Sequence, residues 1–267
     1  MPSPFRYLVY DIESAINKPL LNRVLYASKG LTDEEAYQDH LKELNEKEPE
    51  RNGFINPAFH KPIAIAALAV DADFSILRIG LLGNESRETP AIVEHFWKIY
   101  NDQQPTLVDF FGRGFDIRVL ELWAFMLGIR IDGRHFAQYG TRHKFSDKWH
   151  LDLHDFLTNF GAVRFKGGLN LFSKILGKPG KMETKGSMVQ GLYEEGKIFE
   201  IEDYCLGDAM DTYFVFLRTR VMVGEISLER ERELVEKARS QIEEKAKSDG
   251  YLKLYLANFG EWKREGY

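Results

Sequence analysis

Short hydrophobic runs recur along this sequence and predict the strands of a sheet. The run IAIAALAV at residues 63–70 is apolar throughout, as is typical of a strand that is buried on both faces. A turn at residues 71–74 joins it to a hairpin partner at residues 76–82. Three further strands are expected at residues 7–11, 106–111 and 150–152.

Hydrophobic residues at helical spacing alternate with these strands and continue after them. Thr32 and Glu35 have the spacing of a capping box, so a polar helix is expected at residues 31–50. The stretch 201–223 is apolar on most sides, which predicts a long buried helix. The other expected helices lie at residues 89–100, 115–127, 153–160, 169–176 and 227–247.

The order of these elements predicts an α/β fold with a mixed sheet. A hairpin comes first, helices and strands then alternate, and helices follow the last strand. No linker rich in Pro, Gly or Ser divides the chain. We therefore expect one domain over residues 1–223 and a helical extension over residues 224–267 that packs on it. The polar section at about residues 15–62 is expected to be an insertion between two strands.

Composition and charge narrow the class of protein. The chain has 44% hydrophobic and 29% charged residues, which is ordinary for a globular protein and excludes a disordered one. The single cysteine, Cys205, excludes an intramolecular disulfide framework and a cysteine-rich zinc cluster. No stretch reaches the roughly 20 apolar residues of a membrane span, so we expect a cytoplasmic protein with no membrane partner. The net charge of −5 gives no general reason to expect nucleic acid binding, which must be argued from a site.

Five residues stand apart from the charged surface positions. Asp11 and Glu13 are two residues apart at the end of the first predicted strand, so they point to the same face, about 6–7 Å apart. Asp116 follows a Gly-Arg-Gly break after a buried strand, and Asp208 lies in the apolar helix with Tyr204 one turn before it. Taken singly, each acid has an ordinary explanation: a solvated strand end, a favourable charge at a helix N-terminus, or an internal ion pair.

The order of these residues along the chain resembles the DEDD superfamily of 3′–5′ exonucleases, in its tyrosine subclass. More narrowly, it is similar to the predicted exonuclease family related to the proofreading domain of family B DNA polymerases. The motifs that carry the resemblance are YDIES at residues 10–14, GRGFD at 112–116 and YCLGDAMDTYFVFLR at 204–218. Supporting motifs are HKPIAIAAL at 60–68, HLDLHDFLTNFGA at 150–162 and LGKPGK at 176–181. The resemblance implies a ribonuclease H-like, or DnaQ-like, fold in which a mixed sheet is flanked by helices.

The resemblance also implies the chemistry of the site. It assigns four carboxylates as ligands of two Mg²⁺ or Mn²⁺ ions: Asp11, Glu13, Asp116 and Asp208. Asp11 would bridge both ions, Glu13 and Asp208 would complete the first site, and Asp116 would hold the second. Tyr204 would position or deprotonate the attacking water. Two divalent cations suit phosphodiester hydrolysis because they activate water and stabilise charge on the leaving oxygen.

These observations predict a metal-dependent 3′–5′ exonuclease that acts on single-stranded or frayed 3′ ends of nucleic acid, with DNA as the favoured substrate. An RNA 3′-end trimming exonuclease of the same superfamily is an alternative, because its site residues would be the same. A non-catalytic module that binds nucleic acid ends is a second alternative. A structural α/β protein with coincidental acids is a third, and it would bind no metal ion among the four carboxylates.

Two groups of residues are candidates for contacting the nucleic acid. The first group belongs to or adjoins the GRGFD motif: Phe111, Arg113 and Phe115. Phe111 stands where the family usually has Asn, and either phenylalanine is a candidate to stack on a terminal base. The second group lies in the stretch 164–187, which has six basic residues and one acid. Its lysines are expected to follow the phosphate backbone, unless the stretch is only a solvated surface: Lys178, Lys181 and Lys185.

Overall fold

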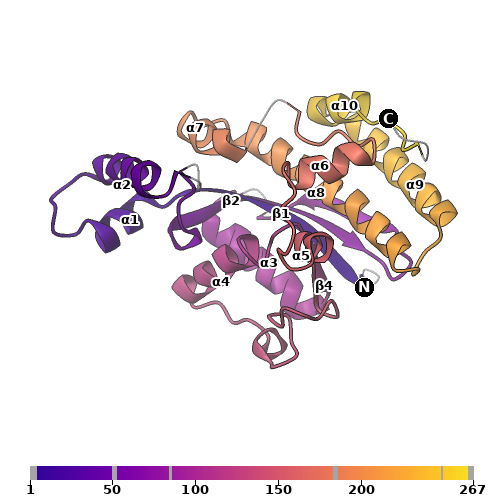
Figure 1. The fold of residues 1–267 in the computed structure, drawn as a ribbon, viewed down its shortest axis with the longest axis horizontal. Coiled ribbons are helices and arrows are strands. Elements are labelled where there is room, and N and C mark those ends of the chain that lie inside the picture. Colours follow the sequence, from indigo (N-terminus) through magenta and orange to yellow (C-terminus); the bar gives the residue numbers. More distant parts are fainter. Residues whose placement is uncertain (1–4, 50–52, 84–85, 183–185, 248, 264–267) are drawn as a thin grey trace.

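A five-stranded mixed sheet forms the centre of the molecule (Figure 1). The computed structural model describes residues 5–49, 53–83, 86–182, 186–247 and 249–263. The strands are β1 (Tyr7–Ile16), β2 (His60–Val70), β3 (Ile76–Leu81), β4 (Thr106–Asp109) and β5 (His150–Asp152). Their spatial order is β3-β2-β1-β4-β5. β2 runs antiparallel to β1 and β3, whereas β1, β4 and β5 run parallel. The mixed sheet confirms the fold-class prediction, and it agrees with a ribonuclease H-like architecture.

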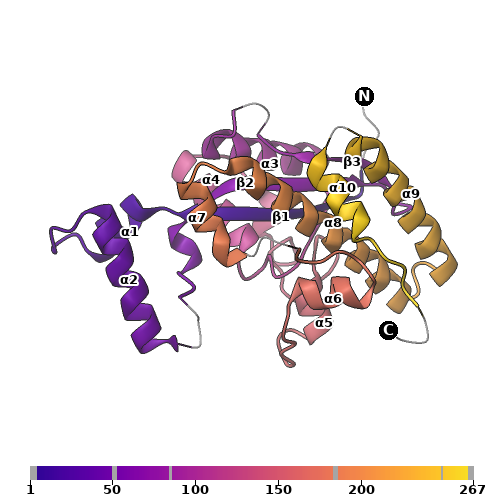
Figure 2. The same ribbon diagram turned by 90° about the horizontal axis from the view of Figure 1, so that it is seen from above.

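Helices cover both faces of the sheet because successive residues of β1 enter two different hydrophobic clusters. Leu8, Tyr10 and Ile12 pack with α3 and α4, and Val9 and Ala15 pack on the opposite side with α8. Figure 2 shows α8 running along the sheet, with α9 and α10 beside it. The helices on the first face are α3 (Thr89–Gln103) and α4 (Asp116–Leu127). Those on the α8 side are α5 (Leu153–Thr158), α6 (Leu169–Ile175), α7 (Val189–Glu194), α8 (Ile198–Met222), α9 (Leu228–Ala246) and α10 (Gly250–Ala257).

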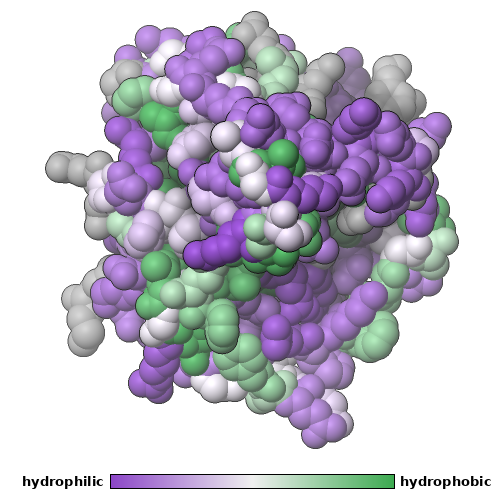
Figure 3. Space-filling model, turned by 90° about the vertical axis from the view of Figure 1, so that its left-hand side faces the viewer, coloured by the Kyte–Doolittle hydropathy of each residue, from purple (hydrophilic) through white to green (hydrophobic). Residues whose placement is uncertain are grey.

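An arm of residues 17–59 lies between β1 and β2 and projects beyond the sheet (Figure 1). It contains α1 (Lys18–Leu25), α2 (Asp33–Lys47) and the 3₁₀ helix η2 (Pro57–Phe59). The capping box at Thr32 and Glu35 is present as predicted. The arm has a small hydrophobic cluster of its own: Leu21, Tyr26, Ala36, Leu44 and Ile55. Figure 3 views the molecule from this side, and most of the surface there is hydrophilic.

Several predicted boundaries differ from the observed ones. The first strand was expected to end at Asp11, but β1 continues to Ile16 because it stays paired with β2 as far as His60. Asp11 and Glu13 therefore lie inside a strand and not at its end. The predicted strand 106–111 ends at Asp109, and α1, α7 and α10 were not predicted, since each is short. In the described parts of the chain, no helix has both the length and the hydrophobicity that a membrane span requires.

Candidate active site

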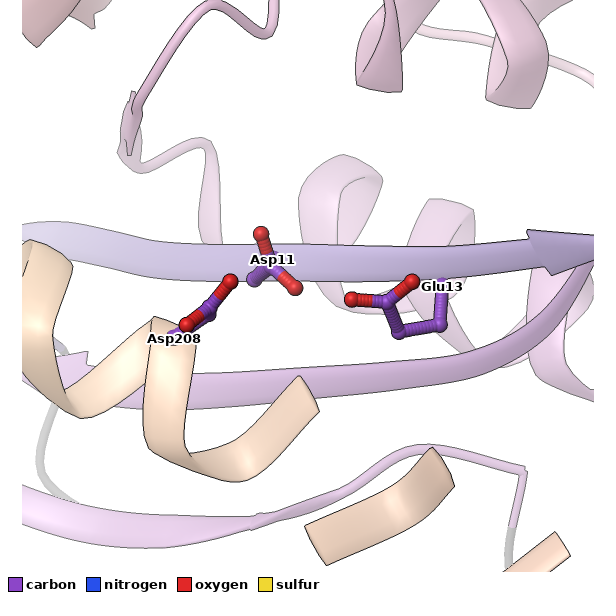
Figure 4. A group of neighbouring side chains, drawn as sticks. All are labelled: Asp11, Glu13 and Asp208. Carbon is purple, nitrogen blue, oxygen red and sulfur yellow. The ribbon is translucent and has the colours of Figure 1, made fainter. Parts of the chain in front are cut away.

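Three of the predicted carboxylates meet between β1 and α8 (Figure 4). Asp11 and Glu13 alternate with residues that face the opposite side, so both point toward α8, where Asp208 lies. One carboxylate oxygen from each residue lies within 4.8 Å of the others. Residues almost 200 positions apart in the sequence thus form one acidic cluster, as the order of the motifs predicted.

Burial and mutual repulsion disfavour the charged form of these acids. Burial raises the pKa of Asp11 well above its usual value, and the charges of Glu13 and Asp208 raise it further. Burial likewise raises the pKa of Glu13, with Asp208 next in effect. The pKa of Asp208 is raised to about 6 by burial, against the opposing effects of Lys181 and of a hydrogen bond with Tyr204. A cation among the three carboxylates would offset this repulsion.

Asp116, the fourth predicted ligand, lies beside this cluster. Its Oδ1 accepts a hydrogen bond from the Ile12 backbone amide at 3.2 Å. The Ile12 amide is free to bond to a side chain because β4 pairs with β1 only as far as Val9 and does not reach Ile12. The charge of Asp116 contributes to the raised pKa values of Asp11 and Glu13. Asp116 is therefore held next to the acidic cluster by the free edge of β1, although it is not one of the three residues whose oxygens lie within 4.8 Å.

The loop that carries Asp116 is shaped by acids from β4 and β5. Asp109 Oδ1 accepts a hydrogen bond from the Gly112 amide at 3.1 Å, and its Oδ2 lies 2.7 Å from His150 Nε2. Asp152 accepts hydrogen bonds from further backbone amides of the same loop. Neither Asp109 nor Asp152 was among the predicted site residues. Asp152 ends the predicted strand 150–152, which was an available signal, whereas Asp109 lay inside the predicted strand 106–111 and gave no such signal.

Tyr204 and Lys181 adjoin the carboxylates. The Tyr204 side chain is buried one helical turn before Asp208, and its hydroxyl hydrogen-bonds to that residue. Burial and then the charge of Asp208 raise the pKa of Tyr204, so its phenol stays protonated. Lys181 Nζ lies 5.7 Å from the centroid of the Tyr204 ring, and its charge lowers the pKa of Glu13 and Asp208. Lys181 is thus the predicted basic residue that lies at the acidic cluster.

The expectation that Lys178 faces nucleic acid is wrong. Lys178 is only 5% exposed. Its Nζ donates a hydrogen bond to the Gly260 carbonyl at 3.2 Å and lies 3.8 Å from the centroid of the Phe259 ring. Burial lowers its pKa to about 8. The side chain has turned toward the C-terminal segment, which sequence spacing does not reveal. Lys185 lies outside the described residues.

Arg113 also has a different role from the one expected. Its side chain is 9% exposed, and its guanidinium donates hydrogen bonds to the backbone carbonyls of Thr141, Ser146 and His150. A guanidinium that is used in this way has few donors left for a phosphate. The prediction that Arg113 contacts nucleic acid is therefore replaced by a structural role, in which it ties the GRGFD loop to residues 141–150.

The two phenylalanines of this loop differ in accessibility. Phe111 is 46% exposed, its ring centroid lies 4.9 Å from that of His154, and its φ is +71°. This left-handed conformation is uncommon for a bulky residue. Phe115 is partly buried, and its ring packs edge-on to His60 at 4.9 Å. Of the pair, Phe111 presents the more accessible ring.

The acidic cluster fits a hard divalent cation. All of its candidate ligand atoms are carboxylate oxygens, which Mg²⁺ and Mn²⁺ prefer. Asp11 Oδ2 is buried and has no hydrogen-bond partner among the described residues. An unpartnered buried carboxylate oxygen is costly unless a ligand or ion satisfies it.

Comparison with known families tests this interpretation. Residues 52–259 match the model of a family described as predicted 3′–5′ exonucleases related to the exonuclease domain of PolB. The chain belongs to this family. Membership confirms the resemblance to this exonuclease family. Exonuclease domains of this kind use divalent metals. No curated protein matches the chain.

The family match and the geometry cover different parts of the site. Asp116, Tyr204 and Asp208 lie within the matched residues, whereas Asp11 and Glu13 precede them. The first motif of the resemblance, YDIES at residues 10–14, therefore lies before the start of the family match. The structure brings Asp11 and Glu13 to Asp208, which lies within the matched residues.

Proposed function

We propose that this protein hydrolyses phosphodiester bonds at the 3′ end of single-stranded nucleic acid, with DNA as the preferred substrate and two Mg²⁺ or Mn²⁺ ions as cofactors. The observation that carries the proposal is the convergence of Asp11, Glu13 and Asp208 in a member of an exonuclease family. The relation of that family to a DNA polymerase exonuclease domain favours DNA over RNA.

The proposal gives each residue of the cluster its own role in holding a metal ion or the attacking water. Asp11, Glu13 and Asp208 would hold one ion, and Asp116 together with Asp11 would hold the second. Bound divalent cations supply an activated water and offset the charge that develops on the phosphate. The protonated Tyr204 hydroxyl donates to Asp208 and would orient the attacking water. Lys181 brings a positive charge to the same place, where a terminal phosphate would approach.

Neutralising one ligand tests the proposal. Asp208→Asn and Asp11→Asn should each reduce Mn²⁺-dependent shortening of a single strand by about 100-fold or more, because each removes a charged metal ligand. The assay uses DNA and RNA strands of one sequence, labelled at the 5′ end, so that 3′ removal produces a ladder of shorter labelled products. Asp102→Asn, an exposed acid at the end of α3, is the matched control and should keep full activity.

Three outcomes would contradict parts of the proposal. Unchanged turnover in both variants would refute the site. Faster cleavage of RNA than of DNA would assign the RNA-trimming alternative. Binding of strands by the wild-type protein with no metal-dependent shortening would instead identify a non-catalytic end-binding module.

A further inference from the structure

A loop between α4 and β5 presents aromatic and basic side chains to solvent. Residues 130–148 contain five Lys or Arg and two Asp in a chain whose net charge is −5. Three large aromatic side chains in this segment are well exposed: Phe136 at 53%, Tyr139 at 69% and Phe145 at 71%. Exposed aromatic residues gathered on one segment are unusual in a protein with no partner for them. We call this segment the aromatic-basic loop.

Buried anchors hold the loop in place. Thr141 is 1% exposed and lies 2.6 Å from the Tyr100 hydroxyl, and His135 is fully buried against Glu121. Arg113 donates to two carbonyls of the loop. The aromatic side chains are therefore held outward on a fixed backbone, and their exposure is not the result of an unstructured segment.

The loop continues the surface of the candidate active site. A groove of about 220 Å³ lies between the GRGFD region and the loop. Its lining has four basic and two acidic residues: Arg113, Arg118, Arg142 and Lys144, with Asp152 and Asp155. The loop's cations also lie over rings: Arg142 is 5.1 Å from the Phe136 centroid, and Lys144 is 5.8 Å from that of Phe160. The groove thus lies between the loop and the GRGFD region, which carries Asp116.

The charges along this groove favour a polyanion. Arg118 and Arg142 both form salt bridges with the single carboxylate of Glu121, whose pKa is lowered to about 2. Positive charge therefore exceeds negative charge around Glu121. Among the described residues, no acid forms a salt bridge with Lys144. A strand that approaches the acidic cluster needs such cations, because the cluster itself repels phosphates.

We propose that the aromatic-basic loop binds the single strand upstream of its 3′ end, with bases stacked on Tyr139 and Phe145 and phosphates near Arg142 and Lys144. Stacking on aromatic rings combined with a basic groove is how proteins bind single strands without sequence preference. This inference rests on the proposed function, since it assumes that the strand ends at the acidic cluster. It also predicts that affinity depends on strand length, because a very short strand occupies the cluster without reaching the loop.

Binding measured without cleavage tests this inference. Fluorescence anisotropy in Mn²⁺, with strands that carry a nuclease-resistant 3′-terminal linkage, compares oligothymidylates of 4 and 16 nucleotides on the wild-type protein and on Tyr139→Ala/Phe145→Ala. The double variant should weaken binding of the 16-mer about 10-fold or more and change binding of the 4-mer less than about twofold. Phe125→Ala is the matched control, because Phe125 on α4 is 85% exposed and outside the loop.

A charge reversal tests the phosphate contacts separately. Lys144→Glu should lower the salt dependence of 16-mer binding by about one counterion. Lys98→Glu should not, because Lys98 on α3 lines a different groove. Equal 16-mer affinity in the wild-type and the double aromatic variant would overturn the inference. An unaltered salt slope in Lys144→Glu would remove its phosphate part. Loop-dependent binding by a protein that cleaves neither DNA nor RNA would refute the proposed function and leave this inference standing.

Discussion

The role of a lysine in this protein is decided by its surroundings. Lys178 and Lys181 are three residues apart in one basic stretch, yet they serve different purposes. Lys181 is exposed next to the acidic cluster, whereas Lys178 is buried against Phe259 and bonded to Gly260. Their chemistry is identical in the sequence, so only the neighbouring groups in the fold distinguish a candidate substrate contact from a structural one.

The burial of Lys178 should make stability depend on pH. Its folded pKa is lowered to about 8 from 10.5, so the unfolded state binds more protons between these values. The cost of burying the charge is fully present below pH 8 and disappears as the pH rises to 10.5. We expect the free energy of unfolding of the wild-type protein to rise by about 2–3 kcal/mol relative to that of Lys178→Met between pH 7 and pH 10. Urea unfolding of both proteins at the two pH values measures this difference in free energy, and an equal difference at pH 7 and pH 10 would contradict the prediction.

The connection between β4 and α4 is the element that positions Asp116. It turns sharply after Asp109 because this acid accepts a hydrogen bond from the Gly112 amide. A Cβ at Gly112 would lie 2.1 Å from Asp109 Oδ2, so glycine is required there by close approach. The hydrophobic pattern predicted a strand through Phe111, since Phe110 and Phe111 extend the apolar run. The turn depends on contacts with β5 that the pattern does not contain.

Gly112→Ala should therefore impair both the loop and the reaction. The added methyl group must displace Asp109, which also contacts His150, and the displacement moves the loop that carries Asp116. We expect a loss of about 1–3 kcal/mol in unfolding free energy and a loss of about 10-fold or more in exonuclease rate. Gly191→Ala in α7 is the control, because its Cβ would meet no atom within 4 Å. Wild-type activity in Gly112→Ala would show that this turn does not position Asp116.

At the scale of the whole molecule, the arm and the sheet are packed very differently. The sheet lies between two large hydrophobic clusters that take residues from many elements. The arm has one small cluster of five buried residues, formed mostly within the arm itself. Because local stability follows the number of buried apolar contacts, the arm should open without unfolding the sheet.

Hydrogen exchange measures this difference. Backbone amides of α1 and α2 should exchange at least about 10-fold faster than those of β1 and β2, with protection in the arm lost before the global unfolding limit is reached. The amides of α8, which lies in the larger cluster, serve as the internal reference. Equal protection in the arm and in α8 would show that both unfold as one unit.

The sequence by itself determined most of the secondary structure, because hydrophobic periodicity is a local property. It predicted the positions of β2, β5, α3, α4, α8 and α9 within a few residues. Through the resemblance that the order of its motifs carries, it also grouped Asp11, Glu13, Asp116 and Asp208 as candidate metal ligands. The family to which the chain belongs followed from the same motifs.

Only the tertiary structure decided what depends on distant neighbours. It extended β1 past Glu13 through pairing with β2, and it placed Asp116 at the Ile12 amide, where β4 no longer covers that edge. It also buried Lys178 and exposed the aromatic side chains of the aromatic-basic loop. Burial, hydrogen-bond partners and local charge come from residues far apart in the chain, so a residue's type and spacing do not determine them.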